Sequence, residues 1–303
     1  TIEAINHGLH SKITYFVPPR DDCELWIVHL ENKTKKDRKL EIFPYVEFLI
    51  GDYHEELRYR NIMALYNRFW FDEDSEAIFA KKTAMWQGMN IQPFDTLIFF
   101  ASSLPVSGCC TRKYEFLGPC NTEEKPQAVI EGQFKNFPLT SGEDGIGCLR
   151  HKLNLKAGQT KDFVVLLGQT TGAPATHKLL AKYRDVKTAQ TELKNTQDLW
   201  KKRITENIEV KTPDKDFDNL VNIWLKYQVY ICSLWSRSPS YYHEGSGGRG
   251  YRDSCQDSEA IVSLNPPWTR LRILKIASLI RRDGTSAPGW SDTTGPSQHR
   301  PIK

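Results

Sequence analysis

The stretch Phe163-Val164-Val165-Leu166-Leu167-Gly168 is an almost wholly apolar run, and soon after its end the chain changes character. Its β-branched and aromatic residues, closed by a glycine, are typical of a buried β-strand. From Ala175 to Asn207 the residues are mostly Lys, Glu, Gln, Leu and Ala, and they predict one or two helices. The chain therefore divides here into a β half and a helical half.

Strand-like runs fill the chain before this boundary. Many strands separated by turns, with little helical periodicity, predict a β-sandwich. The segment Tyr53–Trp70, rich in arginine and aromatic residues, is expected to be a surface strand or hairpin with cation–π packing. The other expected strands are 12–17, 23–30, 40–50, 77–81, 96–101, 128–134 and 148–155.

Helical patterns fill the chain after the boundary. Thr212 is expected as an N-cap, with Pro213 at the first helical position. A second helix is expected after Pro266-Pro267 and is expected to end at Gly284, and residues 236–256 between the two helices are expected to be a loop. The first helix carries one apolar stripe: Phe217, Leu220, Val221, Trp224, Leu225, Ile231, Cys232 and Trp235. The second carries Leu271, Leu274, Ile276, Ala277 and Ile280.

An all-β half before an all-α half argues for separate domains. The expected order is a β-sandwich over residues 1–172, a helical linker over 173–211 and the first hairpins of a helical domain over 212–303. The chain begins with Thr1 rather than methionine and closes on a loop-like segment, so both outer domains are expected to be incomplete.

Composition excludes several function classes. The net charge of +4 is small for 303 residues and its charges are scattered, which argues against nucleic-acid binding. No apolar run reaches the roughly 18 residues that span a membrane, and no signal peptide is expected. The seven cysteines are irregularly spaced, which predicts reduced thiols in a cytoplasmic protein and no zinc site. Cys109-Cys110 and Cys120 are expected to be loop thiols.

The stretch from Tyr241 to Asp257 combines glycines, arginines, carboxylates and tyrosines. Sugar hydroxyls both donate and accept, so they can bridge an arginine and an aspartate while the apolar ring face stacks on an aromatic side chain. The plainer alternative is a glycine-rich surface loop with weak ion pairs. The run is not a phosphate loop, since the Lys-Ser/Thr pair is absent, and His243-Glu244 lacks the second histidine of a metal site.

A second candidate segment, Arg281–Pro296, follows the expected second helix. Trp290 could stack on a sugar ring and Asp292 could accept its hydroxyls. The alternative is a helix-terminating loop with a buried tryptophan, and the residues alone favour it.

The run Gly250-Tyr251-Arg252-Asp253-Ser254-Cys255-Gln256-Asp257 resembles the G-[YF]-R-D-x-x-Q-D motif of the cellobiose and chitobiose phosphorylases, glycoside hydrolase family ninety-four. Tyr114–Gly118 is similar to the family's F-L-G segment, and Asp283–Pro296 stands where its next active-site loop lies. The resemblance implies a β-supersandwich, a helical linker and an (α/α)6 catalytic barrel, and a cytoplasmic enzyme that is usually a homodimer.

The resemblance also implies a reaction and roles. Inorganic phosphate, a co-substrate, attacks the anomeric carbon of a β-linked disaccharide or oligosaccharide and yields an α-sugar 1-phosphate with inversion; no cofactor or metal is needed. Phosphate is already an anion, so one carboxylic acid suffices where inverting hydrolases need two. Arg252 and Asp253 would bind sugar hydroxyls, with Arg249 nearby, while Gln256 and Asp257 would orient Arg252 and Tyr251.

The family's proton donor is expected beyond the end of this chain, so no catalytic residue is assigned here and the chain alone is expected to be inactive. Two alternatives stay open. One is a carbohydrate-binding protein, and the other is a hydrolase on the same fold. Dependence on phosphate separates the phosphorylase from the hydrolase, and turnover by the complete protein separates both from the binding protein.

Overall fold

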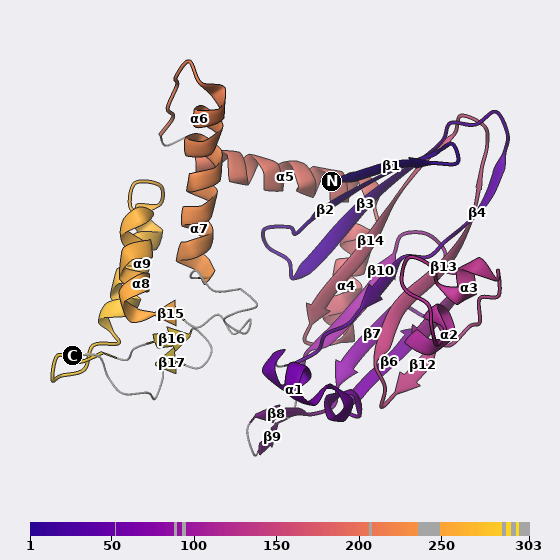
Figure 1. Ribbon diagram of the computed structural model, residues 1–303, viewed down its shortest axis with the longest axis horizontal. Coiled ribbons are helices and arrows are strands. Elements are labelled where there is room, and N and C mark those ends of the chain that lie inside the picture. The colour runs from indigo at the N-terminus through magenta and orange to yellow at the C-terminus, as the bar shows by residue number, and fades with distance from the viewer. Residues whose placement is uncertain are drawn as a thin grey trace. The chain divides into compact units, whose positions relative to one another are not determined.

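The computed structural model describes residues 1–51, 53–87, 90–92, 95–205, 208–235, 249–286, 289–291 and 295–296 (Figure 1). The chain forms two compact units, Thr1–Thr196 and Gln197–Lys303, and the division falls within one long helix. The predicted boundaries at residues 172 and 211 stay predictions.

The first unit is built on a large antiparallel sheet. Its strand order in the described part of the chain is β1-β2-β3-β14-β10-β7-β6-β12. Their bounds are β1 Ile2–Asn6, β2 Leu9–Phe16, β3 Cys23–Asn32, β6 Asn67–Asp72, β7 Ala77–Lys82, β10 Leu97–Ser102, β12 Leu139–Ser141 and β14 Thr160–Thr170.

A smaller antiparallel sheet completes the sandwich. It has the order β11-β13-β4, and β5 pairs with β13. These strands are β4 Arg38–Ile42, β5 Tyr45–Glu47, β11 Gly108–Arg112 and β13 Gly145–Leu155. A separate hairpin joins β8, Met85–Gln87, to β9, Asn90–Gln92. The predicted strand over 40–50 is thus two strands, since Pro44 lies between β4 and β5 and cannot donate to a ladder.

Both faces of the central strands of the large sheet are buried, which explains their continuous apolar runs. In β14, Phe163 and Val165 belong to the core between the two sheets, whereas Val164 and Leu166 face the opposite core. That opposite core is closed by two helices, α4 Ala173–Tyr183 and α5 Val186–Thr205. Leu180, Tyr183 and Ala189 supply their buried side chains. The helices predicted over Ala175–Asn207 are confirmed as α4 and α5 in the described part of that range.

Two short helices, α2 Lys113–Leu117 and α3 Gln127–Ile130, pack on the smaller sheet through Phe116, Leu117 and Ala128. The predicted strand over 128–134 is wrong. Pro126 precedes α3 with an extended φ/ψ, and the amides of Val129 and Ile130 both donate to its carbonyl, so the chain turns into a helix there.

The prediction of a surface strand or hairpin over residues 53–70 is also corrected. The first part of this segment is a helix, α1 Tyr53–Ala64, and only its end enters strand β6. Glu56 on α1 pairs with Lys82 of β7, and both side chains are buried. The helix thus supplies the counter-charge that a buried lysine requires.

All seven cysteines are free. Cys109 and Cys110 are strand residues of β11 and are buried, so the expectation of loop thiols holds only for the exposed Cys120. Burial raises the pKa of Cys23 and of Cys109 to about 12. These thiols fill space in the core rather than react.

The second unit is helical. Its helices are α6 Lys215–Asn219, a π-helical stretch Leu220–Leu225, α7 Lys226–Trp235, α8 Tyr251–Ala260 and α9 Pro266–Ala277. Three short strands also pair here: β15 Arg249–Gly250, β16 Gly289–Ser291 and β17 Gly295–Pro296.

Three expectations are corrected in this unit. Asp214, not Thr212, caps α6, because its carboxylate accepts the amides of Asp216 and Phe217. The expected loop at 236–256 gives way to β15 and α8 from Arg249 onward. Helix α9 ends at Ala277, before Gly284.

A small core of Tyr230, Ile261 and Leu264 holds α7 to α8 and the turn that follows α8. Much of the predicted apolar stripe stays exposed, including Leu220 and Trp224, and so does Leu271 of the second predicted helix. Within the described ranges, no helix combines the length and the apolar character required to cross a membrane.

Candidate functional site

The motif Gly250–Asp257 opens helix α8 rather than lying on a loop. Gly250 is the N-cap, and a Cβ added to it would lie 3.1 Å from the Asp253 carboxylate. Asp253 sits in the first turn, where a negative charge is favoured by the helix dipole. The Ser254 hydroxyl donates to the Gly250 carbonyl at 2.8 Å and fixes that first turn.

Arg252 and Asp253 lie side by side on this first turn. An Arg252 Nη1 donates to Asp253 Oδ1 at 3.2 Å, with 75% and 42% of the two side chains exposed. A surface pair of this kind contributes little to stability. It does present a forked donor next to an acceptor, which matches a pair of sugar hydroxyls. The sugar-binding role of both residues stays a prediction.

Arg249 and Trp290 meet across β15 and β16, where they are directly opposite partners. Arg249 lies 4.8 Å from the centroid of the Trp290 ring, and the indole is only 3% exposed. Arg272 and Lys275 of α9 each lie 5.7 Å from the same centroid. The placement of Trp290 therefore matches the buried alternative, and cationic side chains surround its ring.

The carbonyl of Leu234 stabilises the positive charges that lie close together around Trp290. It lies in the last turn of α7, and both Arg249 and Arg272 donate to it. Carbonyls at a helix C-terminus carry partial negative charge, so two guanidinium groups are stabilised there. On its other edge Trp290 donates from Nε1 to the Ser254 hydroxyl at 3.1 Å, which joins the cluster to the motif helix.

The remaining candidates divide between two faces of α8. Gln256 is exposed like Arg252, whereas Asp257 is buried. Tyr251 lines an apolar groove of about 440 Å³ between α8 and α9. The structure thus joins Arg249 to Trp290 and Arg252 to Asp253, while Tyr251 faces a different surface. Asp292 lies outside the described residues.

Sequence reasoning missed Arg272, Trp268 and Ser254. Arg272 lies over the Trp268 ring at 4.4 Å, one helical turn along α9. The signal was available, since an aromatic and an arginine four residues apart face the same side of a helix. The predicted core positions of this helix were instead the apolar residues, among them Leu271 and Leu274, and both are exposed.

The similar F-L-G segment of the sandwich, Tyr114–Gly118, forms helix α2 and its C-cap. Gly118 has φ +86°, and a Cβ there would lie 2.1 Å from Gln127 Oε1. Glycine is therefore required by the approach of α3 to α2.

Two family descriptions match the chain. "Glycosyl hydrolase 94, supersandwich domain" matches residues 1–186, and "Glycosyl hydrolase 94 superfamily, catalytic domain" matches residues 199–302. The first covers the sandwich with α4, and the second covers the helices that carry the motif. These matches agree with the predicted order of a supersandwich followed by helices of an (α/α)6 domain.

Curated relatives include two phosphorylases. The N,N'-diacetylchitobiose phosphorylase of Vibrio proteolyticus is 28% identical over 89% of this chain and 32% of its own length. The solabiose phosphorylase of Paenibacillus borealis is 28% identical over 95% of this chain and 35% of its own length. The chain thus spans about a third of the length of these relatives.

A solved bacterial glucoamylase, in complex with acarbose, superposes with a TM-score of 0.60 over 96% of this chain and 40% of its own. At 11% sequence identity this likeness concerns the fold alone.

Proposed function

Because this chain belongs to the glycosyl hydrolase 94 family, we propose that it is part of a disaccharide phosphorylase and contributes to the binding of the sugar whose bond is cleaved. The two curated relatives described above are named as phosphorylases, which supports this class of reaction. The substrate is a β-linked disaccharide or oligosaccharide, and the second substrate is inorganic phosphate.

The proposed reaction proceeds with inversion. A phosphate oxygen attacks the anomeric carbon from the face opposite the leaving oxygen, and the glycosidic C–O bond breaks. A carboxylic acid gives its proton to the leaving oxygen, and the product is an α-sugar 1-phosphate. This acid belongs to a later part of the complete protein, so the present chain should bind the sugar without turning it over.

The pairing of Arg252 with Asp253 carries the proposal. Their 3.2 Å contact, on the first turn of a helix within the region matched by the catalytic domain, sets a donor fork and an acceptor on one exposed surface. Arg249 sits near them in sequence but is held by Trp290 and the Leu234 carbonyl, so its part is to fix the start of α8.

The test uses the complete gene product. N,N'-diacetylchitobiose, cellobiose and solabiose are each offered with phosphate, and the sugar 1-phosphate is followed by NMR, which also identifies its anomer. Replacing Arg252 or Asp253 with alanine should lower kcat/KM by roughly 10- to 100-fold, because each loses a charge-assisted hydrogen bond to the sugar. Gln256→Ala, a neighbouring substitution on the same exposed face, should lower kcat/KM less.

The outcomes separate the rival functions. Cleavage that proceeds equally well without phosphate would identify a hydrolase. Saturable sugar binding without any turnover by the complete protein would identify a carbohydrate-binding protein. Steady release of phosphate from a sugar 1-phosphate by the 303-residue chain would show that the proton donor lies within it.

Assembly and location belong to the same proposal. A cytoplasmic homodimer is expected from the family resemblance, and the free cysteines are compatible with a reducing compartment. Sedimentation analysis of the complete protein would test the dimer.

A further inference from the structure

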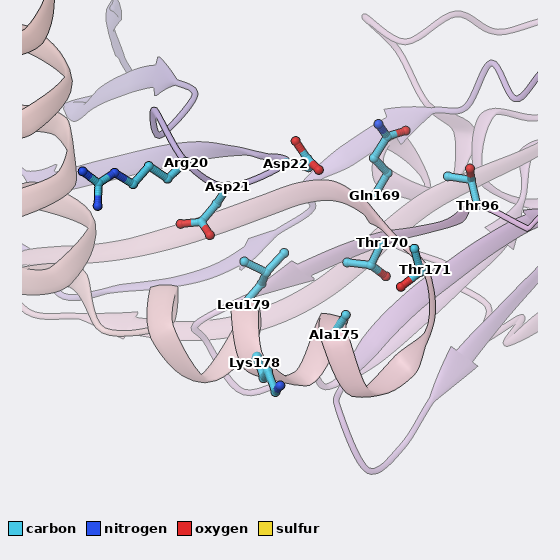
Figure 2. Close-up of a pocket in the computed structure, with 10 residues that line it drawn as sticks. All are labelled: Arg20, Asp21, Asp22, Thr96, Gln169, Thr170, Thr171, Ala175, Lys178 and Leu179. Atoms are coloured by element: carbon cyan, nitrogen blue, oxygen red, sulfur yellow. The ribbon is translucent and has the colours of Figure 1, made fainter. Parts of the chain in front are cut away.

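The first unit contains a cavity that is lined mostly by polar residues, none of which belongs to the motif helix α8. It has a volume of about 460 Å³ and lies where three segments meet: the β2–β3 loop, the end of β14 and helix α4 (Figure 2). Leu179 and Ala175 of α4 give it an apolar floor, with Thr96 at one side. Its polar lining is formed by Arg20, Asp21, Asp22, Gln169, Thr170, Thr171 and Lys178.

The frame of this cavity is fixed by hydrogen bonds. The backbone amide of Gln169 donates to the backbone carbonyl of Asp22 at 3.0 Å and holds the β2–β3 loop against β14. Asp21 accepts from Lys182 at 2.7 Å and from the Tyr183 hydroxyl, both at the end of α4. Although burial acts to raise the pKa of Asp21, these two hydrogen bonds lower it overall, so the carboxylate is charged. The walls are therefore preformed rather than assembled on binding.

Several polar groups of the lining remain available to a ligand. Within the residues that the structure describes, the side chains of Asp22, Gln169 and Lys178 make no hydrogen bond or ion pair with the protein, and neither does that of Arg20. A second polar cavity, beside α2 and α3, differs in this respect. There Glu115 is paired with Lys135, and Gln127 donates to Glu131.

The balance of charge selects the class of ligand. The Asp21 carboxylate is already paired with Lys182, so the remaining charges of the lining are those of Asp22, which disfavours an anion such as phosphate, and of Arg20 and Lys178, which disfavour a cation. The hydroxyls of Thr96 and Thr171 and the side-chain amide of Gln169 both donate and accept, which suits a neutral ligand whose groups do the same. A sugar meets these conditions, since it places hydroxyls at its edge and an apolar face against Leu179 and Ala175.

A neighbouring hollow extends the cavity. It has a volume of about 400 Å³ and shares Asp21, Asp22 and Gln169 with the first. Its other lining residues are mainly apolar: Val17, Cys23, Val46, Phe48, Leu49, Ile98, Leu167 and Gly168, together with Glu24 and Glu47. The two hollows adjoin at these shared residues, and together they are called the groove below. A single monosaccharide would occupy only part of it.

We propose that this groove is an accessory binding site for a neutral oligosaccharide of several units, held at its hydroxyls by Asp22, Gln169 and Lys178. It lies in the sandwich unit and shares no residue with the candidate site on α8. Its role is to retain a sugar chain on the protein independently of bond cleavage.

The test uses the 303-residue chain with two probes, cellotetraose and N-acetylchitotetraose, and saturation-transfer NMR as the readout. At least one tetrasaccharide should bind saturably. The double variant Asp22→Ala/Gln169→Ala should weaken that binding roughly tenfold or more, since it removes two ligand hydrogen bonds. Asp74→Ala, which removes an exposed carboxylate of the β6–β7 turn, is the matched control and should leave binding unchanged.

Two further arms keep this proposal distinct from the phosphorylase proposal. Asp253→Ala should leave tetrasaccharide binding to the groove intact although it lowers kcat/KM of the complete protein. Equal thermal unfolding midpoints of the variants show that the fold is retained. Absence of saturable binding of both probes up to about 10 mM, or binding that the double variant leaves unchanged, overturns the groove proposal.

Discussion

The apolar residues of the two units end in different environments. In the sandwich unit, Phe99 and Val164 on the large sheet are fully buried, with exposed fractions of 0%. In the helical unit, Trp224 and Leu271 belong to equally regular apolar patterns, yet both are 57% exposed. The patterns are comparable, so the difference lies in what stands opposite each element.

The two units differ in where their apolar faces find packing partners. Each face of the large sheet meets the small sheet or helices α4 and α5 within the same unit. The stripe over α6 and α7 and the outer positions of α9 meet no such layer among the described residues. Apolar faces of this extent mark surfaces that other protein surfaces cover. The sandwich should therefore be the stable unit of this chain.

The largest predicted effect compares two aromatic truncations. Phe99→Ala removes a fully buried ring and leaves a cavity between the sheet and the helices, so it should lower the free energy of unfolding by about 3–5 kcal/mol. Trp224→Ala removes a mostly exposed ring and should change it by about 0.5 kcal/mol or less. Urea unfolding followed by circular dichroism measures both. Similar losses for the two variants would show that the helical stripe is packed in solution.

Much of the sandwich could be predicted from the sequence, because strand patterns report burial directly. The alternation of Phe163, Val164, Val165 and Leu166 between two cores produces the apolar run that identified β14. The prediction failed where a buried charge decided the structure. Glu56 on α1 pairs with Lys82, a contact between distant residues that local composition does not contain.

The candidate site was predictable as a motif but not as a geometry. Gly250–Asp257 was identified from its residues, whereas its position at the start of α8 depends on the Gly250 cap and the Ser254 hydroxyl. The burial of Trp290 depends on Arg272 and Lys275, which belong to helix α9 rather than to the motif helix α8. Such contacts are set by tertiary packing and leave only a weak local signal in the sequence.

The tight packing of the sandwich predicts that an added methyl group at Gly145 is destabilising. A Cβ on Gly145 would lie 2.1 Å from the Phe69 ring, whose side chain is fully buried and cannot move aside freely. Gly145→Ala should therefore cost about 1–3 kcal/mol through overpacking. Gly172→Ala is the control for space, because its backbone is extended and the nearest atom to its Cβ position beyond its chain neighbours is Pro174 Cδ at 3.8 Å, an ordinary contact. A urea midpoint for Gly145→Ala equal to that of the wild type would contradict this packing.

A smaller effect is expected at the start of the helical unit. Asp214→Ala removes the acceptor for the amides of Asp216 and Phe217 and should cost about 1 kcal/mol. Asp214→Asn keeps a capping oxygen and should cost much less. Hydrogen exchange at the two amides is the measurement, and it should accelerate only in the alanine variant. Equal exchange in both variants would place the cap elsewhere, for instance at Thr212.

The smallest effect concerns the ion pair that closes the accessory groove. Hydrogen bonds from Lys182 and Tyr183 hold the pKa of Asp21 below its ordinary value, so its charged form is favoured in the folded state. The resulting stability is present above the unfolded-state pKa of about 3.9 and is lost as the pH falls through the lower, folded-state pKa. Lys182 is partly exposed, so screening limits the contribution to less than about 1 kcal/mol.

Asp21→Asn should therefore be less stable than the wild type near pH 7, and the gap should narrow as the pH falls below about 3.9 and through the lower folded-state pKa, where the wild-type carboxyl becomes protonated as well. Thermal unfolding midpoints at several pH values measure the gap. Asp22→Asn is the matched control, because Asp22 makes no side-chain ion pair within the described residues and its replacement should change stability little at either pH. A gap for Asp21→Asn that persisted unchanged in acid would show that the neutral side chain, not the charge, holds the loop to α4.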